Sequence, residues 1–162
     1  MRHWITTTAV VLLTASAVHA ADPPSKAPAP GSAATYLGAQ QLAEVMKGAI
    51  AGGVDPALSQ IANTDQYFIN EVHRTKAAAA NVHPGWTEVH IILAGSGTFV
   101  TGGSVKTVGA AKVIEGGTSR KVAKGDVIIV PADTPHQYTA IDGSLDAIEV
   151  RFITPLEAKP AK

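Results

Sequence analysis

The stretch NVHPGWTEVHIILAGSGTFVT, residues 81–101, carries the pattern that decides the fold class. Two short runs, 89–93 and 98–101, are rich in apolar and β-branched residues, and small residues separate them. Such runs are typical of β-strands, because branched side chains fit a pleated, half-buried surface. The stretch therefore predicts neighbouring strands joined by glycine-containing turns.

Similar runs occur on both sides of this stretch. They occupy residues 66–75, 105–108, 111–114, 119–122, 127–130, 136–140 and 147–153, and Gly, Pro or Asp separates most of them. No helical period of useful length follows residue 60. Many short strands with regular turn signals predict an all-β protein with an antiparallel barrel or sandwich.

The last run, 147–153, alternates apolar and charged residues. Because successive side chains of a strand point to opposite faces, Ile148, Val150 and Phe152 are expected to face the core. Glu149 and Arg151 are then expected on the outside, in a solvated face or in the contact of a homodimer.

The chain before residue 66 has a different pattern. Leu42, Val45, Met46 and Ala49 recur at helical spacing and predict one short amphipathic helix at about 39–50. We assign residues 36–65 to an N-terminal helical segment, in which Asp55-Pro56 can start a second turn of helix.

Both ends of the chain are expected to lie outside the domain. Residues 1–20 combine a basic start, a short apolar run and small residues before Ala21, which predicts a cleaved secretory signal peptide. Residues 21–35 are rich in Pro and Ala and predict a linker, and 156–162 predict a disordered tail. We therefore expect a periplasmic or secreted protein with no membrane contact after cleavage.

The amino-acid composition limits the kinds of metal site and catalytic nucleophile that the protein can have. The chain of 162 residues has no Cys, which excludes disulfides, thiolate metal sites and Cys nucleophiles. Its 13 Lys and Arg balance 13 Asp and Glu, so no general attraction to nucleic acid is expected. Any metal must be held by His and carboxylate side chains.

The first histidine patch lies in residues 81–90. Alternate side chains of a strand share a face, so Asn81 and His83 point the same way, as do Glu88 and His90. A turn at 84–85 lets the two pairs converge.

The second patch is GDVIIVPADTPH, residues 125–136. Here an apolar strand ends in a Pro/Asp turn that delivers His136, with Tyr138 two residues further on the same face. His73 lies in a strand without such a partner motif, so we expect a surface or structural role for it.

The two patches resemble the two motifs of the cupin superfamily. The first cupin motif runs His-x-His, three or four residues, Glu, six residues, Gly. This chain has Asn81-x-His83, four residues, Glu88, six residues and Gly95. Asn81 thus stands where the family has its first His.

The second cupin motif runs Gly, five residues, Pro-x-Gly, two residues, His, three residues, Asn. This chain has Gly125, five residues, Pro131-x-Asp133, two residues and His136, with Ala140 at the final position. The resemblance covers residues 66–155 and implies a cupin-type, jelly-roll-like antiparallel β-barrel with a metal at its centre.

The resemblance implies a ligand set for that metal. Carried over by position, the ligands are His83, Glu88 and His136. Asn81 can coordinate weakly or bond a metal-bound water. His90, at a position expected to face the interior, can complete the coordination or act as a base. The divalent ion can be Fe, Mn, Ni or Zn, because nitrogen and oxygen ligands suit all four.

Two classes of function follow from the resemblance. The first is a metal-dependent oxygenase, isomerase or lyase that acts on a small organic molecule, with His90 and Tyr138 as groups that move a proton. The second is a non-catalytic metal-binding or small-ligand-binding protein of the periplasm. Fold does not choose between them.

Overall fold

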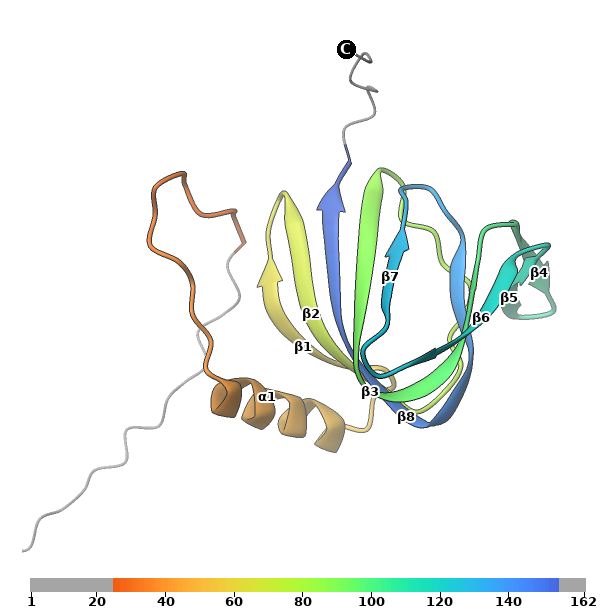
Figure 1. The fold of residues 1–162 in the computed structure, drawn as a ribbon, viewed down its shortest axis with the longest axis horizontal. Helices are drawn as coiled ribbons and strands as arrows, with labels where there is room; N and C mark the ends of the chain where they lie inside the picture. The colour runs from red at the N-terminus through yellow and green to blue at the C-terminus, as the bar shows by residue number, and fades with distance from the viewer. Residues whose placement is uncertain (1–24, 155–162) are drawn as a thin grey trace, which may run out of the picture.

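The structure is a computed structural model, and it describes residues 25–154. The elements in chain order are α1 (Ala39–Ala51), β1 (Ala57–Asn63), β2 (Tyr67–Arg74), β3 (Trp86–Thr101), β4 (Ser104–Val108), β5 (Ala111–Glu115), β6 (Thr118–Ala123), β7 (Val127–Val130) and β8 (His136–Ile153) (Figure 1). The expected signal peptide at 1–20 and tail at 156–162 lie outside the described residues. Within the described part, no helix combines the length and apolar character needed to cross a bilayer.

One curved antiparallel sheet forms the body of the domain. Its strand order is β1-β2-β8-β3-β6, and β7 pairs with β3. Register shifts interrupt the long β3–β8 ladder at three places, between residues 92 and 99 of β3. Such irregularities bend strands, and the sheet curls around its own interior, with the β4–β5 hairpin at one end (Figure 1). The predicted antiparallel barrel is confirmed.

Two pairs of predicted runs are continuous strands. Residues 89–93 and 98–101 both belong to β3, and 136–140 and 147–153 both belong to β8. Gly95 and Gly143 have φ values of 74° and 80° inside these strands. Glycine adopts such angles without steric cost, so the chain bends at these points without ending the strand.

The N-terminal segment is partly helical. The predicted helix is present as α1, which buries Met46 and packs on β1 and β2. Residues 57–63, expected in the helical segment, instead form β1, which pairs with β2 from Ala57↔His73 to Asn63↔Phe68. Ala, Leu and Gln in this strand favour a helix by themselves, but pairing with β2 overrides that preference.

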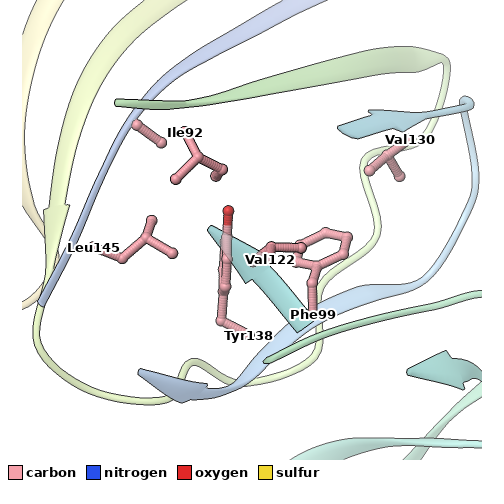
Figure 2. Packing of buried hydrophobic residues seen from close by; sticks show 7 residues of the cluster. Ile92, Phe99, Val122, Val130, Tyr138 and Leu145 are labelled. Atoms are coloured by element: carbon pink, nitrogen blue, oxygen red, sulfur yellow. The ribbon is translucent and has the colours of Figure 1, made fainter. Parts of the chain in front are cut away.

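The core lies on the inner face of the curved sheet. Phe99 and Tyr138 meet at its centre, with their ring centroids 4.8 Å apart. The buried cluster comprises Ile92, Phe99, Val122, Val130, Tyr138, Leu145 and Ala147 (Figure 2). Glu88, His90 and Glu149 lie on the same inner face and are also buried, so the interior combines an apolar part with a polar one.

The prediction for the last strand is wrong. Leu145, Ala147 and Glu149 face the interior, where Glu149 is 4% exposed, while Phe152 is 42% exposed. The outer face of the neighbouring strand is apolar as well, since Ile91 is exposed there. On this strand, the alternation of apolar and charged residues therefore does not show which face points inward. The carboxylate of Glu149 is stable in the interior because Arg74 and His90 contact it.

Gly95 offers a test of the β3–β8 contact. A Cβ added at Gly95 would collide with the carbonyl oxygen of Ser144, and the residue also has positive φ. We expect Gly95→Ala to destabilise the protein by about 3 kcal/mol, from backbone strain and the forced separation of strands. Urea unfolding measures this loss.

Gly143 provides the matched control for this test. It has a similar φ of 80°, but a Cβ there would meet no atom within 4 Å. Gly143→Ala should therefore lose only about 1 kcal/mol, the cost of left-handed backbone for an L-residue. Equal losses at both positions would show that the close approach to Ser144 contributes nothing.

Candidate metal centre

Three segments far apart in sequence place the candidate site residues. Glu88 and His90 lie on β3, His83 lies in the loop before β3, and His136 begins β8. Asn81 and His136 exchange two backbone hydrogen bonds, each 3.0 Å long. This isolated bridge holds the two histidine patches side by side.

The turn before His136 also contacts the first patch. Asp133 has a φ of 63°, in the left-handed region that Asp tolerates better than most residues. Its Oδ1 accepts a hydrogen bond from the backbone N–H of Gly85 at 3.2 Å. The Asp133 side chain therefore adds a contact between the two patches.

His83, Glu88 and His136 bring one donor atom each within 4.8 Å of one another. Glu88 Oε2 lies 3.1 Å from His136 Nε2 and 3.5 Å from His83 Nε2. The Glu88 side chain is 2% exposed. The structure thus brings together the three residues that the resemblance implies as ligands.

The hydrogen bonding of these groups fits a cation. His136 Nδ1 lies 3.0 Å from the carbonyl oxygen of Thr134, so this nitrogen carries the donated hydrogen. In its neutral form, His136 turns the lone pair of Nε2 toward Glu88 Oε2, a buried atom with no hydrogen-bond partner among the described residues. In its protonated form, Nε2 donates a hydrogen to that oxygen, 3.1 Å away. Two facing lone pairs need a proton or a metal ion between them, and two imidazoles with one carboxylate suit a divalent metal.

The local charges tune the ionisation of these groups. Burial alone would raise the pKa of Glu88, but the nearby His136, His90 and Arg151 lower it to about 2. Burial and the positive charge of Arg151 lower the pKa of His83. Burial opposes protonation of His136, but Glu88 and the Thr134 carbonyl raise its pKa. The carboxylate is therefore ionised and ready to bind a cation.

His90 lies behind the carboxylate of Glu88. Its Nε2 is 3.6 Å from Glu88 Oε1 and has no hydrogen-bond partner among the described residues. Its Nδ1 lies 3.2 Å from Tyr138 Oη and 3.3 Å from Glu149 Oε1. In Figure 2 the Tyr138 hydroxyl points into the barrel toward Ile92. His90 thus contacts both the ligand carboxylate and a buried tyrosine.

Asn81 lies beside the first ligand. Its Nδ2 is 3.1 Å from His83 Nε2, and its Oδ1 accepts a hydrogen bond from the backbone of Val82. Binding of a metal through His83 Nε2 would replace the amide contact. Asn81 would then be free to turn toward the ion or toward a water bound to it.

A small cavity of about 90 Å³ opens at these residues. Its walls include all three candidate ligands, together with Arg74, Asn81, Gln137, Tyr138, Glu149, Arg151 and the loop residues Ala78 and Ala79. The site is therefore accessible to a small molecule beside the candidate ligands.

A family model described as the AraC-like ligand-binding domain matches residues 63–155, more than half of the chain. The chain belongs to this family. The match spans the sheet from the end of β1 to β8 and includes every candidate ligand. No curated protein matches the chain.

Solved structures similar to this AraC-like domain include a cupin superfamily protein from Desulfitobacterium hafniense, at 18% identity and TM-score 0.44, covering 60% of this chain and 76% of that one. A protein described as a predicted oxalate decarboxylase from Thermotoga maritima is 17% identical, with TM-score 0.39 and coverages of 54% and 66%. The DMSP lyase DddQ from Ruegeria pomeroyi is 21% identical, with TM-score 0.47 and coverages of 65% and 50%. The chain thus spans less than two thirds of the length of the second and third of these proteins, 66% and 50%. The resemblance to cupins predicted from the sequence is confirmed.

Three residues of this AraC-like domain's polar interior were not expected there from the sequence: Arg74, Glu149 and Arg151. Arg74 Nη2 donates to Glu149 Oε1 at 2.6 Å, and the two side chains are 12% and 5% exposed. Arg151 Nε donates to Glu88 Oε1 at 3.1 Å. The presence of charged residues in the otherwise apolar run 147–153 could have indicated a polar interior. The alternation of side chains along that run instead led to the expectation that Glu149 and Arg151 lie outside.

Trp86 and His73 lie away from the site. Trp86 packs on Phe68, with ring centroids 5.0 Å apart, and is not among the residues that line the cavity. His73 Nδ1 lies 2.6 Å from Asp146 Oδ1, within hydrogen-bonding distance. Both arrangements are structural, as expected for His73.

Proposed function

We propose that this protein is an exported, single-domain cupin that binds one divalent metal ion through His83, Glu88 and His136. We further propose that it is a metal-dependent enzyme acting on a small organic molecule. The observation that carries the proposal is the buried Glu88 Oε2, which has no hydrogen-bond partner among residues 25–154 and lies 3.1 Å and 3.5 Å from two imidazole nitrogens. Export rests on the sequence pattern of residues 1–20.

Each residue of the site has a role in this proposal. A divalent ion supplies Lewis-acid polarisation of a substrate oxygen when bound. Tyr138 is a neutral O–H donor at ordinary pH, because burial raises the pKa of its hydroxyl well above the usual range. His90 contacts this hydroxyl through Nδ1 and can relay a proton between Tyr138 and the site. Glu149 Oε1 lies 3.3 Å from the same nitrogen and accepts its hydrogen when Nδ1 is protonated.

Metal analysis of the purified protein tests the proposal. We expect about one metal ion per chain by elemental analysis, since one group of three ligands is present in the described chain. Oxygen uptake and product analysis with small phenols, keto acids and thiols then test turnover. Absence of metal, with no uptake from Fe, Mn, Ni or Zn solutions, would reject the site.

A non-catalytic role is the second candidate, and the family's description as a ligand-binding domain favours it. In that case the metal-loaded protein binds a small ligand, and the ligand is recovered unchanged. Turnover of any compound of the panel by the wild-type protein, lost in His136→Ala, would decide for the enzyme.

A further inference from the structure

The cavity beside the candidate ligands is lined by two positively charged side chains that are not themselves candidate ligands. Two guanidinium groups, those of Arg74 and Arg151, line it together with the carboxylates of Glu88 and Glu149. Arg74 is paired with Glu149 and Arg151 with Glu88, so the four side chains balance. This inference rests on the proposed function, because a divalent ion held by His83, Glu88 and His136 would leave the cavity with an excess of two positive charges.

An excess charge in a partly buried cavity needs an anion. Coulomb attraction between unit charges about 4 Å apart is worth about 1 kcal/mol in water and several times more near a protein surface. The remaining polar groups in the cavity wall, such as Asn81 and Gln137, are neutral. A negatively charged ligand would therefore be favoured over a neutral one of the same shape.

Arg151 has donors available for such a ligand. Its Nε bonds Glu88, and within the described residues its two terminal amino groups make no hydrogen bond and no ion pair. The side chain is 27% exposed, so it is neither sealed in the core nor free in solvent. A planar guanidinium with its terminal nitrogens free matches the two oxygens of a carboxylate.

Arg74 adds a second donor. Its Nη2 bonds Glu149, and its guanidinium lies over the Tyr138 ring at 5.1 Å from the centroid. Its Nε is buried and has no hydrogen-bond partner among the described residues. An unsatisfied buried donor is costly, and an acceptor oxygen in the cavity would remove that cost.

The size of the cavity limits the ligand. A volume of about 90 Å³ corresponds to about three water molecules at about 30 Å³ each. This is room for a carboxylate and one or two further atoms. We propose that the site takes a small carboxylic acid, with its carboxylate held by Arg151 beside the metal ligands and within reach of Arg74.

Calorimetric titration of the zinc-loaded protein tests this proposal. Acetate and formate are the probes, and acetamide and formamide are their neutral counterparts. We expect the carboxylates to bind at least about tenfold more tightly than the amides, and Arg151→Met to weaken acetate binding about 10- to 100-fold, as loss of a charge-assisted hydrogen bond does. Arg120→Met, which removes an exposed arginine outside this cavity, should leave acetate binding unchanged.

Three results would overturn the proposal: equal binding of acetate and acetamide, unchanged acetate binding in Arg151→Met, or Arg151-dependent binding of inorganic phosphate that is tighter than that of acetate. Zinc content is measured on every sample, so a wild-type protein without zinc rejects the metal site, whereas a zinc-loaded protein indifferent to charge rejects the carboxylate alone. If the Arg151→Met protein releases zinc, the Arg151→Lys variant is used in its place. Lys keeps a positive charge beside Glu88 but lacks the planar guanidinium that can bind both oxygens of a carboxylate.

Discussion

The His136→Ala protein is expected to lose nearly all of the metal that the wild-type protein carries. His136 supplies the imidazole nitrogen nearest to Glu88, at 3.1 Å, and its ring is oriented by the Thr134 carbonyl. Loss of an outer partner of a ligand already costs about 10–100-fold in metal affinity, so loss of a ligand itself should cost more than about 100-fold. Elemental analysis and competition with a chelator measure the change.

His73→Ala is the matched control, because it removes a histidine that also faces a carboxylate. The pair of His73 and Asp146 is 2.6 Å apart, but it is partly exposed and lies outside the candidate centre. Its loss should leave the metal content unchanged and cost at most about 1 kcal/mol in stability. Equal loss of metal in the two variants would mean that the histidines are assigned to the wrong roles.

His90→Gln separates the alternatives left open for this residue. If His90 completes the coordination, the variant loses metal affinity as His136→Ala does. If it moves a proton behind Glu88, as its contact with Tyr138 suggests, the variant keeps the metal and loses turnover.

Arg74→Met is expected to destabilise the protein by about 3–5 kcal/mol, because it leaves Glu149 charged and buried without its main partner. The Arg74 and Glu149 side chains are 12% and 5% exposed, and the two charged groups approach to 2.6 Å. Against the effect of burial, His90 and then Arg74 hold the pKa of Glu149 at about 2. Urea unfolding of the metal-free protein measures the loss.

A double variant and a surface variant test whether the loss of stability comes from burying Glu149 without its partner. Arg74→Met with Glu149→Leu should recover most of the stability, since replacing a whole buried ion pair by apolar residues is often nearly neutral. Lys121→Met breaks an exposed pair, Lys121 and Asp142, 3.7 Å apart, and should cost less than about 1 kcal/mol. A loss of that small size in Arg74→Met would show that Glu149 is not effectively buried.

The strand pattern was predictable because it depends on local residue preferences. Six of the predicted runs correspond closely to β2, β4, β5, β6, β7 and the start of β3, and the helix at 39–51 follows from its apolar spacing. The continuity of β3 and β8 was not predictable, since Gly95 and Gly143 read as strand ends in sequence. Pairing with neighbouring strands carries the chain through both glycines.

The candidate ligands were predictable because their spacing matches a known pair of motifs. His83, Glu88 and His136 were singled out by that resemblance, and the structure brings their donor atoms together. The strands and bridges that these residues pair with could not be predicted from the motifs. The bridge between Asn81 and His136 joins segments more than fifty positions apart in the printed sequence.

The sequence alone determined the all-β class, the helix, the exclusion of thiolate chemistry and the three candidate ligands. Only the tertiary structure decided which charges lie inside the barrel. Glu149 and Arg151 alternate with apolar residues on a strand whose two faces are both partly apolar, so the period of two could not tell the inner face from the outer one. The inner position of Glu149 depends on Arg74 and His90, which other strands deliver. A buried charge is stable only beside such partners, and partners from distant strands are a property of the folded chain.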